Sequence, residues 1–207
     1  MAPARLVVAT RNEHKLRELR EILSGVQLEP LAAGVELPPE DGETFAANAL
    51  IKAGAAQAAT ACPAIADDSG IAAGVLGGRP GVRSARYAGP EATDTENLAL
   101  LLRELDGAVD RRVDYVCVIA YVDEGGDEMV FEGSCEGELA REPRGSGGFG
   151  YDPAFVPRET GPGDERTMAE LEPEVKHAIS HRGRAARLLA SHLGLPAAAR
   201  PAPGALP

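Results

Sequence analysis

The stretch LVVATRNEHKLRELREIL, residues 6–23, decides the fold class of this chain. Residues 6–9 are a short, apolar, valine-containing run, which predicts a strand. From residue 13 onward, leucine and isoleucine recur at helical spacing, and Gly25 can end the helix. A strand that leads through a polar turn directly into a helix is typical of an α/β protein.

The rest of the chain continues this alternation of strand and helix patterns. The expected elements are helices over residues 45–59 and 176–193, a helix behind the Thr93–Glu96 capping box, a capped turn at Thr167–Glu170, a short strand over 64–66, and a hairpin of strands over 113–122 and 129–135. Leu188, Leu189 and Leu193 are expected to face inward, and the glycine-rich residues 74–89 to form an irregular loop. The pattern predicts an α/β fold with a mixed, twisted sheet and flanking helices.

The segment after the last predicted helix differs in composition from the rest. Residues 196–207 are rich in Pro and Ala and offer little apolar surface to bury. We therefore expect one α/β domain over residues 1–195, followed by a disordered tail.

Charge and hydropathy argue against several classes of partner. The chain has 207 residues, of which 21 are Lys or Arg and 32 are Asp or Glu, so its formal net charge is −11. Such a surface repels extended nucleic acid, although a local pocket can still attract a small anion. No apolar stretch approaches the roughly 20 residues of a membrane span, and the N-terminal apolar run is too short for a signal peptide. The expected location is the cytoplasm.

The cysteines predict neither a disulfide framework nor a metal site. Cys62, Cys117 and Cys135 are odd in number and lie far apart, with no CxxC spacing. Cys117 lies within an apolar run, which favours a buried, unreactive thiol. This cysteine usage is typical of a reducing compartment.

The first polar cluster is Thr10-Arg11-Asn12-Glu13-His14-Lys15, between the first strand and the first helix. Free backbone N–H groups and the positive end of the helix dipole favour anions there. The cluster is therefore a candidate phosphate site. Helix capping plus a surface lysine explains the same residues without a ligand.

Two further clusters place carboxylates beside a cation. Asn48 and Lys52 are four residues apart on one predicted helix face, with Glu40 and Glu43 before them as possible metal ligands. Asp67-Asp68-Ser69-Gly70 directly follows a predicted strand. Adjacent carboxylates favour a nearby cation, and magnesium prefers oxygen ligands, so one hypothesis is a magnesium site. A solvated helix face and a simple turn are the alternatives.

The last two clusters lie in the C-terminal half. The segment from Gly145 to Asp152 combines glycines with Phe149 and Tyr151, which suit a flat base, and Asp152 can accept from a ring N–H. Near the start of the last predicted helix lies a group of cations and a hydroxyl, comprising Lys176, Ser180, His181 and Arg182. Cations at a helix start are unfavourable unless an anion compensates them, which favours contact with a ligand.

In this order the clusters resemble the inosine triphosphate pyrophosphatase family. The matching segments are residues 9–15, 43–53, 66–70, 80–87, 147–153 and 180–182. The resemblance implies two lobes around a central cleft, a homodimer, and Mg²⁺-dependent hydrolysis of non-standard purine nucleoside triphosphates (inosine, deoxyinosine and xanthosine) to the monophosphate and pyrophosphate.

The resemblance also implies roles for individual residues. Asp68 and Lys52 would be catalytic, Asp68 by activating water and Lys52 by holding the phosphates, and the metal would lie on Asp68, Asp67 and Glu40. The substrate would contact Thr10, Arg11, Asn12, Glu13, His14, Lys15, Asn48, Ser69, Phe149, Gly150, Tyr151, Asp152, Lys176, His181 and Arg182. Donors such as His181 and Arg182 would favour a purine with a 6-oxo group.

Two positions depart from the family pattern, and two other functions compete with this one. Gly74 stands where an acidic residue is expected, and Arg83 stands where an aromatic one is common. Both departures bear on fine specificity or dimer contacts. The competing functions are a general phosphatase that releases the γ-phosphate or accepts canonical nucleotides, and a nucleotide-binding module without catalysis.

Overall fold

The computed structural model describes residues 3–196 and contains one six-stranded sheet with strand order β2-β1-β3-β4-β5-β6. The strands are β1 (Arg5–Val8), β2 (Gln27–Pro30), β3 (Ala64–Ala73), β4 (Arg112–Val122), β5 (Glu128–Leu139) and β6 (Phe155–Pro157). Strand β1 pairs in parallel with β2 and β3, whereas β5 and β6 are antiparallel. The predicted α/β class with a mixed sheet is therefore confirmed.

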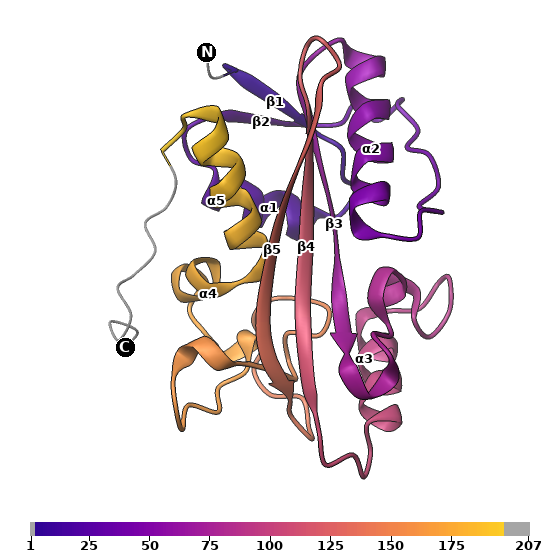
Figure 1. Ribbon diagram of the computed structural model, residues 1–207, viewed down its shortest axis with the longest axis vertical. Helices are drawn as coiled ribbons and strands as arrows, with labels where there is room; N and C mark the ends of the chain where they lie inside the picture. Colours follow the sequence, from indigo (N-terminus) through magenta and orange to yellow (C-terminus); the bar gives the residue numbers. More distant parts are fainter. Residues whose placement is uncertain (1–2, 197–207) are drawn as a thin grey trace. The chain divides into compact units, whose positions relative to one another are not determined.

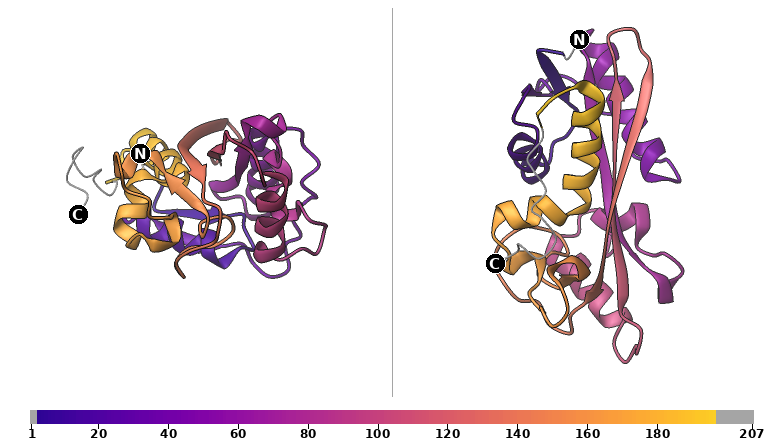
Figure 2. Two further views of the ribbon diagram at one scale, coloured as in Figure 1. Left: turned by 90° about the horizontal axis from the view of Figure 1, so that it is seen from below. Right: turned by 60° about the vertical axis from the view of Figure 1, so that its left-hand side comes forward.

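Five α-helices and four short 3₁₀ helices accompany the described strands (Figures 1 and 2). The α-helices are α1 (Glu13–Ile22), α2 (Phe45–Thr60), α3 (Asp94–Glu104), α4 (Pro173–Ile179) and α5 (His181–Leu193), and the 3₁₀ helices are η1 (Gly74–Leu76), η2 (Gly81–Arg86), η3 (Arg158–Thr160) and η4 (Met168–Glu170). Among residues 3–196, no helix is both long enough and apolar enough to cross a bilayer.

The chain divides into two compact units. Within the described residues, unit 1 comprises residues 3–68, 117–133 and 181–196, and unit 2 comprises residues 69–116 and 134–180. Strands β3, β4 and β5 contribute residues to both units. The expected disordered tail lies, from residue 197 onward, outside the described residues.

Unit 1 has two apolar layers, one on each face of its strands. Helices α1 and α5 pack together and cover one face, and α2 covers the other (Figure 1). Successive residues of a strand point to opposite faces, so Val8 packs with the α1–α5 layer and Val7 with the α2 layer. The many small residues of α2 suit this close packing, since Ala49, Ala53 and Ala56 are fully buried.

Unit 2 has an apolar core of its own. It lies between α3, α4 and those segments of strands β3, β4 and β5 that belong to unit 2. Leu98, Leu101 and Leu105 form the predicted stripe on α3, and they pack with Tyr115 and Phe155. The Thr93–Glu96 capping box is present at the start of α3, as its sequence predicts. The core fixes the position of β4, which carries Tyr115.

Three local predictions are wrong. The short strand expected over residues 64–66 continues to Ala73 as β3, and the buried charge of Asp67 within it is compensated by Lys15 and Arg182. The single helix expected over residues 176–193 is two helices, since Ser180 has an extended backbone with ψ of 155°. Leu188 was expected inside but is 51% exposed, whereas Leu189 and Leu193 are buried.

Other differences are smaller. The short strands β2 and β6 were not predicted, since each has only four or fewer residues and little periodicity to detect. The segment of residues 74–89, expected to be irregular, contains η1 and η2. By contrast, Thr44 caps α2 as predicted, and Thr167 and Glu170 form the predicted capping box.

Candidate active site

The start of α1 lies directly after β1, and Asn12 caps it. The Asn12 Oδ1 accepts hydrogen bonds from the backbone N–H groups of His14 at 2.9 Å and Lys15 at 3.1 Å, and Thr10 Oγ1 accepts from the Asn12 N–H. The cap satisfies two of the free N–H groups and holds the turn rigid. Capping and an anion site are compatible here, because Lys15 extends from the first turn toward a buried carboxylate.

Three other members of this cluster are exposed. The Arg11 guanidinium donates to the backbone carbonyls of Leu31, Ala32 and Val35, so it braces the loop after β2. Glu13 is exposed, and the exposed His14 contacts Arg17 through Nδ1. Lys15 is therefore the cation of this turn that is best placed for a phosphate.

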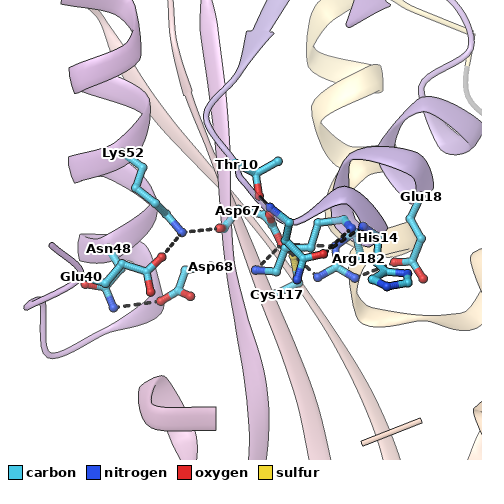
Figure 3. A network of polar contacts seen from close by, with 12 residues as sticks. Thr10, His14, Glu18, Glu40, Asn48, Lys52, Asp67, Asp68, Cys117 and Arg182 are labelled. Atoms are coloured by element: carbon cyan, nitrogen blue, oxygen red, sulfur yellow. Dashed lines mark hydrogen bonds and ion pairs between the residues drawn. The ribbon is translucent and has the colours of Figure 1, made fainter. Parts of the chain in front are cut away.

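Asp67 is the centre of a buried charge network in unit 1 (Figure 3). Its Oδ2 accepts from Arg182 Nη2 at 3.0 Å and Nε at 3.2 Å, and it lies 3.1 Å from Lys15 Nζ. A second carboxylate, Glu18 on α1, accepts from Arg182 Nη1 at 2.6 Å. Asp67 is 1% exposed, Arg182 2% and Glu18 8%.

The network determines the ionisation of its members. Burial by itself would raise the pKa of the Asp67 carboxyl, but Lys15, Arg182 and Lys52 outweigh burial and hold that pKa well below its ordinary value. Burial, followed by the nearby Asp67 charge, raises the pKa of the Cys117 thiol to about 12. Cys117 is thus the buried, unreactive thiol that its apolar surroundings predict.

Asp68 points away from Asp67, because consecutive strand residues face opposite sides of a sheet. Its Oδ2 accepts from Asn48 Nδ2 at 2.9 Å, and Asn48 Oδ1 in turn accepts from the Gly42 N–H at 2.8 Å. Asn48 is fully buried. Both ends of its amide are thereby engaged, and Asn48 orients Asp68.

Lys52 and Glu40 belong to the same group of polar residues in unit 1 as Asp68 (Figure 3). Lys52 Nζ donates to Glu40 Oε1 at 2.5 Å and to the Asp67 backbone carbonyl at 2.7 Å. Burial raises the pKa of the Asp68 carboxyl, Lys52 and the Asn48 hydrogen bond oppose that rise, and Glu40 adds to it. Asp68 is therefore a carboxylate with increased affinity for a proton, held beside an ammonium group and a second carboxylate.

The structure separates the two candidate acids before α2. Glu40 is half-buried and pairs with Lys52, whereas Glu43 is exposed. Within the part of the chain that the structure describes, no three His, Cys, Asp or Glu side chains gather to hold a metal by themselves. Glu40 and Asp68 are thus the pair of carboxylates that could share one metal with a substrate phosphate.

The predicted base-binding segment lies in unit 2 and is organised by Asp152. Its Oδ2 accepts from the Phe149 N–H at 2.9 Å and from Lys176 Nζ at 2.7 Å. Lys176 Nζ also lies 5.3 Å from the centre of the Phe149 ring, a cation–π distance. Asp152 and Lys176 are buried, whereas Phe149 and Gly150 are half-buried.

The remaining predicted residues fall in different places. Ser69 is half-buried in unit 2, directly after Asp68 in β3. Tyr151 is buried, and its hydroxyl donates to the Ser84 backbone carbonyl at 2.8 Å. His181 begins α5 in unit 1 and is 5% exposed. A Cβ on Gly133 of β5 would lie 2.3 Å from the carbonyl oxygen of His181, so only glycine allows β5 to approach α5 this closely.

Two polar residues of these clusters were missed in the sequence. Glu18 lies between apolar positions of the α1 pattern and reads as a surface acid, although it is buried against Arg182. Tyr115 reads as an apolar strand residue, although its hydroxyl contacts Asp152. A charged or hydroxylated side chain at a buried position of a helix or strand is the signal that identifies such residues.

The two departures from the family pattern both lie in exposed parts of unit 2. Gly74 begins η1, and a Cβ built there would have no atom within 4 Å. Arg83 lies in η2 and is exposed. Nothing in the structure explains either residue.

Comparison with known proteins decides the relationship that these clusters indicate. A sequence model of the Ham1 family matches residues 6–192. The chain belongs to the Ham1 family. The resemblance drawn from the motifs is thereby confirmed.

Named relatives of this Ham1-family protein are similar over most of their length. The dITP/XTP pyrophosphatase of Geobacter sulfurreducens is 49% identical over 197 residues, which cover 92% of this chain and 96% of that protein. The dITP/XTP pyrophosphatase of Mycobacterium tuberculosis is 49% identical over 194 residues, covering 89% and 93%.

Solved structures give the same relationship. A HAM1 protein from Coxiella burnetii has a TM-score of 0.81 at 43% identity, covering 92% of this chain and 98% of that one. The nucleoside-triphosphatase / dITP/XTP pyrophosphatase of Mycobacterium abscessus has a TM-score of 0.71 at 46% identity, covering 89% and 98%. The Ham1 fold of this protein is therefore supported by both sequence and structure.

Proposed function

We propose that this protein hydrolyses nucleoside triphosphates between the α- and β-phosphates, releasing the nucleoside monophosphate and pyrophosphate. Its preferred substrates are the triphosphates of inosine, deoxyinosine and xanthosine. The observation that carries the proposal is the buried Asp68 carboxylate, oriented by Asn48 and flanked by the Lys52 ammonium group. The names of the relatives, dITP/XTP pyrophosphatase, support the reaction and the class of substrate.

In this proposal Asp68 accepts a proton from the attacking water. The water oxygen bonds to one phosphorus of the α–β bridge, the bond between that phosphorus and the bridging oxygen breaks, and the nucleoside monophosphate and pyrophosphate separate. The hydrogen bond from Asn48 holds Asp68 Oδ2, which keeps the carboxylate in one orientation. Lys15 and Lys52 are the cations of unit 1 that would neutralise phosphate oxygens and the charge that develops on them.

The carboxylates of unit 1 also fit a magnesium ion. Magnesium commonly binds one or two carboxylates, keeps several waters and takes its other ligands from phosphates. Glu40 and Asp68 would hold it, and it would supply charge stabilisation at the phosphates. Asp67 was expected to be a third ligand, but we revise that assignment, because its Oδ2 binds Arg182 and Lys15.

Replacing Glu40 with glutamine should raise the Mg²⁺ concentration needed for half-maximal activity by about tenfold, the effect expected when one charged ligand is lost. Glu43→Gln is the matched control, since Glu43 lies on the same loop but is exposed. Titration of activity with MgCl₂ measures both. An equal effect in the two variants, or none in either, would remove Glu40 from the metal site.

The base would bind to the segment of unit 2 organised by Asp152. Phe149 offers a half-buried ring for stacking, Asp152 can accept from a ring N–H, and Lys176 is a cation that can donate to a 6-oxo group. We also assign base contact to His181, at the start of α5. Arg182 is revised from a base contact to a member of the buried network, because Asp67 and Glu18 occupy its guanidinium.

Selection for a 6-oxo purine follows from this chemistry. Adenine has an amine where hypoxanthine and xanthine have an oxygen, so a site with donors at that point would leave them without partners. Buried polar groups without partners typically cost about 1–3 kcal/mol each. Adenosine triphosphate should therefore react more slowly than inosine triphosphate.

Product analysis tests the proposal. Purified protein with Mg²⁺ is incubated with the triphosphates of inosine, xanthosine, adenosine and guanosine, and the products are separated. Pyrophosphate and monophosphate from the first two, with much less from the others, are the expected result. Release of orthophosphate would favour a general phosphatase, and binding without turnover would favour a nucleotide-binding module.

We further propose a cytoplasmic homodimer. Cys62, Cys117 and Cys135 are free thiols, which suits a reducing compartment. The dimer rests on the family resemblance, and analytical ultracentrifugation of the purified chain tests it. A single species at the monomer mass would contradict it.

A further inference from the structure

Tyr115 connects strand β4 to the base-binding segment of unit 2. Its hydroxyl donates to Asp152 Oδ1 at 3.3 Å and accepts from the Tyr151 N–H at 3.1 Å. The side chain is buried, with 6% of its surface exposed. One hydroxyl thus holds two consecutive residues of the segment, one through its backbone and one through its carboxylate.

The position of this hydroxyl is determined by the core of unit 2. The Tyr115 ring packs against the Phe155 ring, with centroids 4.6 Å apart and planes inclined at 50°. Burial, followed by the Asp152 charge, holds the pKa of Tyr115 well above its ordinary value. The hydroxyl therefore keeps its proton and remains a donor to Asp152 near neutral pH.

The segment needs such a support because its own backbone is permissive. Gly148 and Gly150 have positive φ angles of 68° and 63°, which glycine adopts readily in the unbound chain as well as in this turn. A Cβ on Gly148 would lie 2.1 Å from Asp152 Oδ2, so the backbone passes directly over the carboxylate. Hydrogen bonds therefore hold the turn, and backbone preference does not: Asp152 accepts from the Phe149 N–H at 2.9 Å, and Asp94 accepts from the Gly150 N–H at 2.7 Å.

The partners of Asp152 are divided between its two oxygens. Oδ2 accepts from Phe149 and Lys176, which belong to the predicted base site themselves. Oδ1 accepts from Tyr115, which comes from the sheet. Tyr115 therefore joins the Asp152 carboxylate to strand β4 in the core of unit 2, and its hydrogen bond orients that carboxylate.

We propose that Tyr115 is a positioning residue for base selection, whose hydroxyl orients the Asp152 carboxylate and the adjoining aromatic segment toward a 6-oxo purine. The inference rests on the proposed function, and it assigns to Tyr115 no contact with the phosphates. Its loss should affect recognition of the base and leave phosphate binding and chemistry unchanged.

Tyr115→Phe tests this inference, because it removes one oxygen and keeps the ring packed on Phe155. Tyr121→Phe is the matched control: Tyr121 lies on the same strand, is 7% exposed, and has no hydrogen-bond partner for its hydroxyl within residues 3–196. Four quantities are measured for each protein: KM and kcat for inosine triphosphate, the same constants for adenosine triphosphate, the inhibition constant of inorganic tripolyphosphate, and the dissociation constant of inosine monophosphate.

For Tyr115→Phe we expect KM for inosine triphosphate and the dissociation constant of inosine monophosphate to rise about tenfold, the size of effect expected when buried polar groups lose a partner. The preference for inosine over adenosine triphosphate should fall by a similar factor. The kcat of Tyr115→Phe should stay within about twofold of wild type, and so should its inhibition constant for tripolyphosphate, which has no base. All constants of Tyr121→Phe should also stay within about twofold of wild type.

Other results would overturn the positioning role of Tyr115, the proposed function, or both. Wild-type constants in Tyr115→Phe, or a loss that affects tripolyphosphate as much as inosine triphosphate, would overturn the positioning role. A wild-type chain that binds inosine monophosphate but releases no pyrophosphate would contradict the proposed function alone, since the binding comparison still tests Tyr115. A wild-type chain that neither binds nor hydrolyses these nucleotides would overturn both.

Discussion

Replacing Asp68 with asparagine should lower kcat for inosine triphosphate by about a hundredfold or more and change KM only a few-fold. Asparagine keeps the size of the side chain and its place in the buried site, but it cannot accept a proton from water. Asp68 is 5% exposed and hydrogen-bonded to Asn48, so the change acts on one oriented group. Initial rates of pyrophosphate release measure the effect.

Asp114→Asn is the matched control for this substitution. Asp114 is an exposed carboxylate on β4 of unit 2, so the same chemical change there should leave kcat and KM at their wild-type values. Near-normal kcat in Asp68→Asn would remove Asp68 from the chemistry. In that case Glu40 would be the next carboxylate of unit 1 to test, because it is paired with the same lysine.

Replacing Arg182 with alanine should lower the free energy of unfolding by about 3–5 kcal/mol, as is usual when one partner of a buried ion pair is removed. The substitution leaves Asp67 and Glu18 buried without the guanidinium that now joins them. For a chain of this size the melting temperature should fall by roughly 10 °C. Circular dichroism or calorimetry measures the change.

Arg158→Ala is the contrasting control. Its partner is Glu136 at 2.8 Å, and the two side chains are 59% and 61% exposed. Surface pairs of this kind typically contribute less than about 1 kcal/mol, so the melting temperature should hardly change. A loss in Arg182→Ala no larger than in Arg158→Ala would show that the buried network does not stabilise unit 1.

A triple variant separates charge from packing. Adding Asp67→Asn and Glu18→Gln to Arg182→Met removes the charges of these three buried side chains and keeps most of their volume, while the more accessible Lys15 stays charged. Replacement of a buried ion triad by groups of similar size is often close to neutral. We therefore expect the triple variant to be more stable than Arg182→Ala, and the opposite order would place the main contribution in the packing of the arginine.

Features with local causes could be predicted from the sequence. The strand and helix over residues 6–23, the cap at Thr44 and the capping box at Thr93 follow from side chains within a few residues of one another. The polar clusters around Lys15, Lys52 and Asp68 were also identified, because their residue types and spacing suit phosphate and metal chemistry. The membership of the Ham1 family followed from the order of these clusters.

Features that depend on distant partners could not be predicted in this way. Asp67 and Asp68 look equivalent in the sequence, and both were expected to hold metal. The strand directs them to opposite faces, where Asp67 meets Arg182, 115 residues away in the chain, and Asp68 meets Asn48. Arg182, which was expected to contact the base, is buried against Asp67 and Glu18 for the same reason.

The sequence alone thus determined the α/β class, the family, the caps of the helices and the residues from which a phosphate, metal and base site can be built. Only the tertiary structure decided which of these residues face each other: Asp67 with Arg182, Asp68 with Asn48, and Asp152 with Tyr115. The physical reason is that backbone propensity and capping act over a few residues. The energy of a buried charge or hydroxyl instead depends on the partner that folding brings within about 3 Å.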